Sequence, residues 1–204
     1  MCLTDAGPAG WVEQQTLRWM NRYLKQDKRV DTGPRFEWIA DDGQVRSAPD
    51  YPPPTQRIDA ARGSGVFALN PDAATSGLLV AATPSPLGIH LPIDAPAAGT
   101  QIVGPPKLTL SYSGLGTSSS APVYAQVVDK TRNLVVGNVV TPLRLVLDGL
   151  PHTATVNLEE IAASVTAGSS YELQIIPASS VYAPQRVAGL IDMSSIGLTL
   201  PVSP

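Results

Sequence analysis

The sequence predicts a mainly β protein: an antiparallel two-sheet β-sandwich of jelly-roll type, preceded by an α-helix and a short β-hairpin. Three observations predict this fold class. Apolar and polar residues alternate with period 2 in a series of segments over the second half of the chain, which is typical of strands with one buried face. The 17 glycines and 20 prolines among 204 residues supply the chain reversals that many short strands need. The 3.6-residue periodicity of an amphipathic helix is found near the N-terminus.

The charged residues are distributed unevenly, and this divides the chain after Arg62. Residues 1–62 carry 18 charged side chains and all three tryptophans, whereas residues 63–204 carry 13 charged side chains. We therefore expect a helix, a hairpin and a linker over 1–62, and the sandwich over 63–204. The run Tyr51-Pro52-Pro53-Pro54 lies near this junction and predicts a stiff, extended connection.

Composition excludes several classes of protein. With 43% hydrophobic residues and a net charge of −3, the chain is neither disordered nor a basic nucleic-acid binder. The single cysteine, Cys2, excludes a disulfide scaffold and a cysteine-based zinc site. The sequence shows no secretory signal and no apolar run long enough to span a membrane, and it leaves the localisation open.

Residues 9–26 have the pattern of an amphipathic helix whose apolar face needs a partner. A lone helix cannot bury such a face by itself, so we expect it to pack on the sandwich, on a second copy, or on a domain outside this chain. Core or interface packing is also the simplest role for the tryptophans. The predicted interface residues are Trp11, Val12, Trp19, Met20, Tyr23 and Leu24.

A hairpin is expected after the helix. Residues 35–39 alternate as a strand, Asp41-Asp42-Gly43 forms a turn, and residues 45–48 return. In the sandwich, residues 123–128 are apolar on both faces, and residues 114–122 are predicted to form a flexible Gly/Ser loop. Residues 159–165 are predicted to form one short helical turn that ends at Gly168.

The period-2 rows predict about eight strands in the sandwich. Their expected inward-facing residues are Leu108, Leu110, Tyr112, Leu143, Leu145, Leu147, Ala154, Val156, Leu158, Tyr171, Leu173, Ile175, Ile196, Leu198 and Leu200.

The sequence contains no recognisable active site, so we predict no catalytic, cofactor-binding or metal-binding residue. Gly63-Ser64-Gly65 is the nearest approach to a nucleophile elbow, but it precedes a predicted strand and does not connect a strand to a helix. His90 and His152 are expected to be structural or solvent-facing, with no evident carboxylate or serine partner. Glu159-Glu160 is interpreted as a solvated helix start, because adjacent side chains point apart.

The order of several motifs resembles the C-terminal portion of the X-Pro dipeptidyl-peptidase, cocaine esterase and α-amino-acid ester hydrolase family. Each motif is weak alone, and their order carries the resemblance. Residues 11–25 (WVEQQTLRWMNRYLK) resemble the last helix of the family's hydrolase domain. The other matching segments are 33–39 (GPRFEWI), 45–48 (VRSA), 51–52 (YP), 103–110 (VGPPKLTL), 123–129 (VYAQVVD), 156–159 (VNLE), Gly168 and 171–175 (YELQI).

This resemblance implies a galactose-binding-like jelly roll that packs beside an α/β-hydrolase domain. In the family that domain supplies the Ser, Asp and His of a serine hydrolase, so none of them is expected in this chain. The implied function is a non-catalytic C-terminal domain of an X-Pro dipeptidyl-peptidase or acyl esterase. One alternative is a free-standing jelly-roll module that binds a ligand or carbohydrate, with Tyr112 and Tyr182 as candidate loop aromatics. The other is an assembly domain that forms a homodimer through the helix face.

Overall fold

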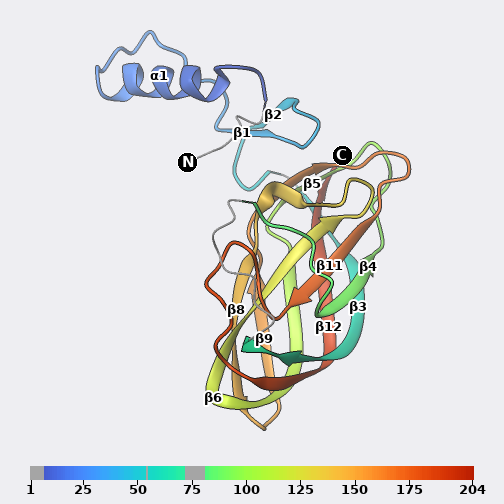
Figure 1. The fold of residues 1–204 in the computed structure, drawn as a ribbon. Coiled ribbons are helices and arrows are strands. Elements are labelled where there is room, and N and C mark those ends of the chain that lie inside the picture. The colour runs from blue at the N-terminus through green and yellow to red at the C-terminus, as the bar shows by residue number, and fades with distance from the viewer. Residues whose placement is uncertain (1–6, 54, 72–80) are drawn as a thin grey trace.

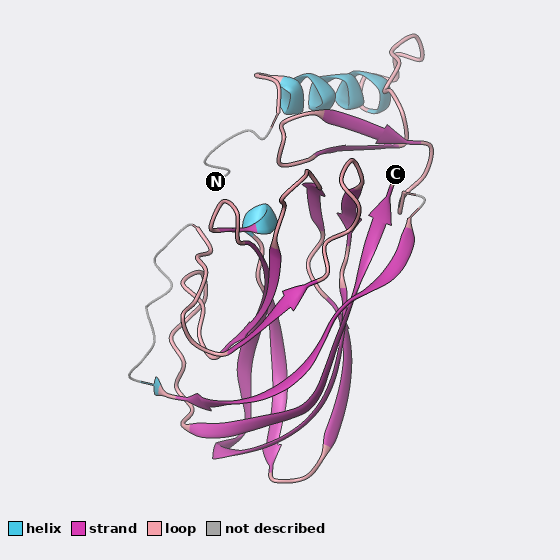
Figure 2. Cartoon of the chain, turned by 90° about the vertical axis from the view of Figure 1, so that its right-hand side faces the viewer, coloured by secondary structure: helices cyan, strands magenta, loops and turns pink. Residues whose placement is uncertain are grey.

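The computed structural model describes residues 7–53, 55–71 and 81–204. A helix and a hairpin lie at one end of a tall β-sandwich, and the C-terminus returns to the same end (Figures 1 and 2). The helix is α1 (Trp11–Tyr23), and the hairpin consists of β1 (Phe36–Ile39) and β2 (Val45–Ala48). These three elements confirm the predicted helix and hairpin, with the helix shorter at both ends than its periodic pattern.

Within the described residues, ten strands form the sandwich, and all of them pair antiparallel. The first of them begins at Gln56, so the sandwich starts before the compositional division at Arg62. They are β3 (Gln56–Leu69), β4 (Ile89–Ile93), β5 (Gln101–Gly104), β6 (Lys107–Asp129), β7 (Leu134–Val135), β8 (Thr141–Asp148), β9 (His152–Asn157), β10 (Ile161–Ser164), β11 (Tyr171–Ile176) and β12 (Gly189–Ser203), with a 3-10 turn, η2 (Val136–Asn138), after β7.

The long strand β6 belongs to both layers of the sandwich. Its first half pairs with β9 and β12, and β12 pairs along most of its length with β3. Its second half pairs with β8 and β11, and β11 pairs with β4. The two layers are therefore one curled antiparallel sheet that folds back on itself, as Figure 2 shows. This arrangement confirms the predicted jelly-roll-like sandwich.

The predicted apolar rows meet between the two layers. Along β8 the burial alternates strictly, with Leu143, Leu145 and Leu147 inside, as period 2 requires. A second, smaller apolar cluster lies on the outer face of β6 and β11, where the rings of Tyr124 and Tyr182 stack 4.9 Å apart. This second cluster explains why residues 123–128 are apolar on both faces.

The predicted flexible loop at 114–122 is wrong, because these residues continue β6. Their glycines serve close packing. A Cβ on Gly114 would lie 2.5 Å from a methyl carbon of the buried Leu147, and one on Gly116 would lie 2.8 Å from the other methyl carbon. The pairing with β8 shifts register between Leu115 and Ser120. Glycine inside a strand often marks such a close approach or bend.

The predicted helical turn at 159–165 is also wrong. Residues 161–164 form β10, which pairs with β5. Ile161 and Ala163 point inward and are buried, so the partner strand and the core outweigh the weak local preference for a helix. Glu159 and Glu160 consequently precede a strand and do not start a helix.

Candidate functional site

Helix α1 turns its apolar face away from the rest of the chain. It begins after Gly10, whose φ is 73°, and the amide of Trp11 donates to the carbonyl of Pro8 at 3.0 Å. No residue of α1 is buried. The residues that are exposed although large and apolar are Val12, Leu17, Trp19, Met20, Tyr23 and, just after the helix, Leu24, with exposed fractions from 43% to 70%.

Five of the six predicted interface residues thus lie on one uncovered surface, which we call the helix face: Val12, Trp19, Met20, Tyr23 and Leu24. Trp11 is half-buried at the start of the helix. The rings of Trp19 and Tyr23 lie 5.0 Å apart, so two aromatic side chains form a continuous apolar surface. Groups of this size normally bury their area in a core or an interface.

The hairpin lies between α1 and the sandwich (Figure 2). Phe36 packs against Trp38 and Tyr51, with ring centroids 5.4 and 4.9 Å apart. The indole N–H of Trp38 donates to the amide oxygen of Gln101 on β5 at 3.1 Å, and the Tyr51 hydroxyl donates to Glu160. Glu160 therefore helps to hold the hairpin segment on the sandwich.

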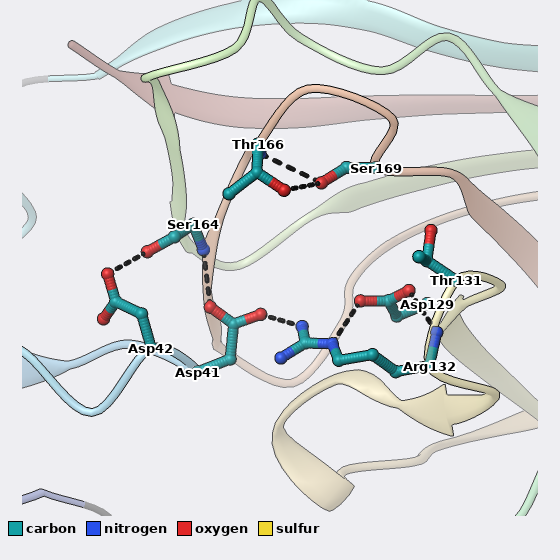
Figure 3. A pocket seen from close by; sticks show the side chains of 8 residues that line it. All are labelled: Asp41, Asp42, Asp129, Thr131, Arg132, Ser164, Thr166 and Ser169. Atoms are coloured by element: carbon teal, nitrogen blue, oxygen red, sulfur yellow. Dashed lines mark hydrogen bonds and ion pairs between the residues drawn. The ribbon is translucent and has the colours of Figure 1, made fainter.

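The turn of the hairpin inserts two carboxylates into a polar cavity of about 170 Å³ at the end of the sandwich (Figure 3). One Asp41 oxygen accepts the Ser164 amide at 2.8 Å, and the other accepts the Arg132 guanidinium. Asp42 accepts the Ser164 hydroxyl at 2.9 Å. The turn itself is the one predicted, with the Gly43 amide bonded to the carbonyl of Ala40 at 2.9 Å.

The charges around this turn compensate one another. Hydrogen bonds from Arg46 hold the pKa of Asp42 far below its ordinary value. Burial alone would lower the pKa of Arg132, but its bonds to Asp41 and Asp129 outweigh burial and raise it. These bonds favour the charged forms of the Asp42 carboxylate and of the Arg46 and Arg132 guanidinium groups.

Both histidines have carboxylate partners that the sequence did not reveal. His90 Nδ1 lies 3.0 Å from a Glu172 oxygen, and His152 Nε2 lies 2.8 Å from an Asp148 oxygen. Within the described residues, neither ring is hydrogen-bonded to a serine hydroxyl. The two pairs therefore lack the nucleophile that a catalytic triad needs.

Glu172 belongs to a larger polar network on the outer face of β11. Burial raises the pKa of this carboxyl, but hydrogen bonds from Gln174, Lys130 and His90 outweigh burial and bring the pKa below its ordinary value. Gln126 extends the network by donating to Gln174 at 2.8 Å. The partly buried carboxylate is thus paired and hydrogen-bonded, as a structural ion should be.

The Gly63-Ser64-Gly65 segment lies in the middle of β3 and is not a turn. A Cβ on Gly63 would lie 2.5 Å from Leu91, and one on Gly65 would lie 2.9 Å from Ile89. The glycines allow β4 to pack closely on β3. Their spacing reflects packing between strands, and the segment lacks the strand-to-helix geometry of a nucleophile elbow.

The two tyrosines considered for sugar binding have structural contacts. Tyr112 is buried, and its hydroxyl accepts the amide of Val146 at 3.1 Å. Tyr182 stacks on Tyr124 and donates to the carbonyl of Val140 at 3.2 Å. Tyr112 therefore offers no free face on which a sugar could stack, and one face of the Tyr182 ring is covered by Tyr124.

The described residues contain no cluster of three or more His, Cys, Asp or Glu side chains arranged to hold a metal ion. In the same part of the chain, no helix has both the length and the apolar character needed to cross a membrane.

Comparison with solved structures identifies proteins with the same fold. An aminopeptidase from the marine sediment archaeon Thaumarchaeota archaeon matches 96% of this chain with a TM-score of 0.68 and 12% identity. A CocE/NonD family hydrolase from Staphylococcus aureus matches 96% with a TM-score of 0.57 and 14% identity. This chain spans 44% and 46% of the lengths of those chains. No protein-family model and no curated protein matches the sequence.

These matches confirm, for the fold, the resemblance that the order of motifs indicated. They cover the helix and hairpin as well as the sandwich, since nearly the whole chain is aligned. Each matched hydrolase chain also contains more than half of its length outside the aligned part.

Proposed function

We propose that this chain is the non-catalytic accessory part of a serine hydrolase, and that its helix face docks on an α/β-hydrolase domain outside this chain. The observation that carries the proposal is α1, a helix without a buried residue that exposes two aromatic and several aliphatic side chains. Fully burying a Leu or Met side chain contributes about 1.5–3 kcal/mol. Burial of the exposed helix face against a partner would therefore favour binding substantially.

The solved neighbours support the kind of partner. In each, a segment with this fold occupies under half of a chain whose printed description is an aminopeptidase or a CocE/NonD family hydrolase. By analogy, the catalytic Ser, His and Asp would lie on the docked domain. The sandwich would then pack beside that domain and support its active site. The finer activity that we propose is hydrolysis of X-Pro peptides or acyl esters.

The test compares the 204-residue chain with the protein isolated from its source organism. Both are treated with a fluorophosphonate probe and assayed on X-Pro-p-nitroanilides and p-nitrophenyl acyl esters. We expect the isolated chain to give background rates and no labelling. We expect the native protein, purified with an antibody to the sandwich, to be labelled and active. Labelling of a serine within the 204 residues would contradict the proposal.

The helix face can be tested in the same native protein. Replacing Leu24 with Ser and Trp19 with Ser removes apolar area from the proposed interface without touching the sandwich core. We expect the double variant to lose hydrolase activity or yield through failed docking. A matched pair on the opposite end of the sandwich, Leu115→Ser and Leu190→Ser, also removes two exposed apolar side chains and should leave activity unchanged.

A further inference from the structure

At the contact between the hairpin and the sandwich, the turn of the hairpin inserts into a cavity at the end of the sandwich. The turn residues are Asp41 and Asp42, and the groups that receive them come from separate places in the sandwich. Ser164 is the last residue of β10, and Arg132 follows the end of β6. Figure 3 shows the turn and these side chains converging on the same cavity.

The sandwich side of this contact is held in place by its own hydrogen bonds. Asp129, almost fully buried, accepts the Nε of Arg132 at 2.7 Å and the Arg132 backbone amide at 3.0 Å. Asp129 therefore holds the guanidinium in the orientation in which it donates to Asp41. A planar guanidinium fixed in this way gives directional recognition of a carboxylate.

The hairpin side is also organised locally. The Gln44 amide donates to Asp42 at 3.0 Å, and Arg46 donates to the same carboxylate at 2.8 Å. These bonds shape the turn, from which Asp41 reaches Ser164 and Arg132 and Asp42 also reaches the Ser164 hydroxyl. Each of the two surfaces is therefore held by hydrogen bonds within its own chain segment.

Apart from the bonds of the turn, the described residues 7–53 make two further hydrogen bonds to the sandwich. They are the Trp38–Gln101 and Tyr51–Glu160 bonds. The cavity at the turn also shows that this part of the contact is not filled by apolar side chains. Polar contacts of this kind fix orientation more strongly than they contribute free energy, since water competes for the same groups.

We propose that the Asp41–Arg132–Ser164 contact is a latch that fixes the orientation of residues 7–53 relative to the sandwich. When the latch is closed, the helix face is held in one orientation at the end of the sandwich. When it is open, residues 7–53 change their orientation relative to the sandwich, which begins with β3 at Gln56. The latch is a property of this chain alone, and it stands or falls independently of any hydrolase partner.

The test measures the distance between the helix and the sandwich by pulsed electron paramagnetic resonance. Spin labels are attached to cysteines placed at the exposed positions Gln14 and Thr155, in a Cys2→Ser background. We expect one narrow distance distribution for the otherwise unchanged chain. Asp41→Ala removes the two hydrogen bonds that Asp41 accepts from Ser164 and Arg132. For this variant we expect a broadened distance distribution that includes distances absent from the parent.

The matched control is Asp59→Ala. It also removes an aspartate bonded to an arginine, but the pair Asp59–Arg62 lies within β3. Its distribution should superimpose on that of the parent. If Asp41→Ala disrupts the hairpin, seen as lost helical circular dichroism, Arg132→Gln decides, because it leaves the hairpin sequence intact and must broaden the distribution in the same way. A narrow, unshifted distribution in Arg132→Gln, or in a folded Asp41→Ala, would overturn the latch.

Discussion

The sandwich and the helix–hairpin segment solve the problem of burying apolar surface in opposite ways. The sandwich places its apolar rows between two layers, and thirty buried residues form one cluster there. Among the described residues 7–48, only Ala40 and Ala48 are buried, and large apolar side chains such as Trp19, Tyr23 and Leu24 are exposed. The difference shows that the apolar rows of the sandwich are buried within this chain, whereas the apolar face of α1 is not covered by the described residues.

The largest effect should come from the sandwich core. Leu173 on β11 is fully buried between the layers, so Leu173→Ala removes its contacts and leaves a cavity. We expect a loss of about 2–5 kcal/mol in the free energy of unfolding, measured by urea denaturation. The paired change Leu24→Ala, on a side chain that is 70% exposed, should cost less than about 0.5 kcal/mol. Equal losses at the two positions would contradict the comparison.

A second prediction concerns backbone packing within β12. A Cβ on Gly189 would lie 2.6 Å from the carbonyl oxygen of Leu115, so Gly189→Ala forces two strands apart. We expect a loss of about 1–3 kcal/mol in stability. Gly197, in the same strand, has no atom within 4 Å of such a Cβ. Thermal unfolding of Gly197→Ala should therefore match the parent, and a similar loss in both variants would refute the packing explanation.

A third, smaller effect concerns pH. Because the folded pKa of Glu172 is depressed, its contribution to stability is complete at neutral pH and is lost as pH falls through the range where carboxyls protonate. Glu172→Gln should cost about 1–2 kcal/mol at pH 7 and much less near pH 3. Chemical denaturation at both pH values measures this difference. A difference between parent and variant that grows toward low pH would have the wrong sign for this account.

The smallest effect on stability should come from the helix face itself. Trp19→Ser removes a side chain that is 57% exposed and packs on Tyr23. We expect a change within about 0.5 kcal/mol, together with weaker binding of a dye that reports exposed apolar surface. Unfolding of the whole chain by this change would show that the face already belongs to a core within these residues.

Much of the sandwich can be predicted from sequence because period 2 acts locally. The rows through Leu143 and Leu173 identify buried faces without knowledge of their neighbours. The strand at 161–164 could not be predicted, since its conformation depends on pairing with β5. Gly114 and Gly116 led to the wrong prediction of a loop, because composition does not distinguish a flexible loop from a strand that another side chain closely approaches.

The candidate site shows the same limit. The apolar stripe of α1 follows directly from 3.6-residue spacing, and five of the six residues selected for it are exposed on one face. The latch partners Arg132 and Ser164 lie 91 and 123 positions from Asp41. The carboxylate partner of His90 depends on the register of β4 against β11. No local pattern carries such long-range pairings.

The most direct measurement of the central claim is hydroxyl-radical footprinting with mass spectrometry. It compares Trp19 and Tyr23 in the isolated 204-residue chain and in the native protein from the source organism, with Leu115 at the far end of the sandwich as the internal reference. We predict that both aromatic residues are strongly oxidised in the isolated chain and protected in the native protein, while Leu115 changes little. Equal oxidation of Trp19 and Tyr23 in the two samples would contradict docking of the helix face on another domain.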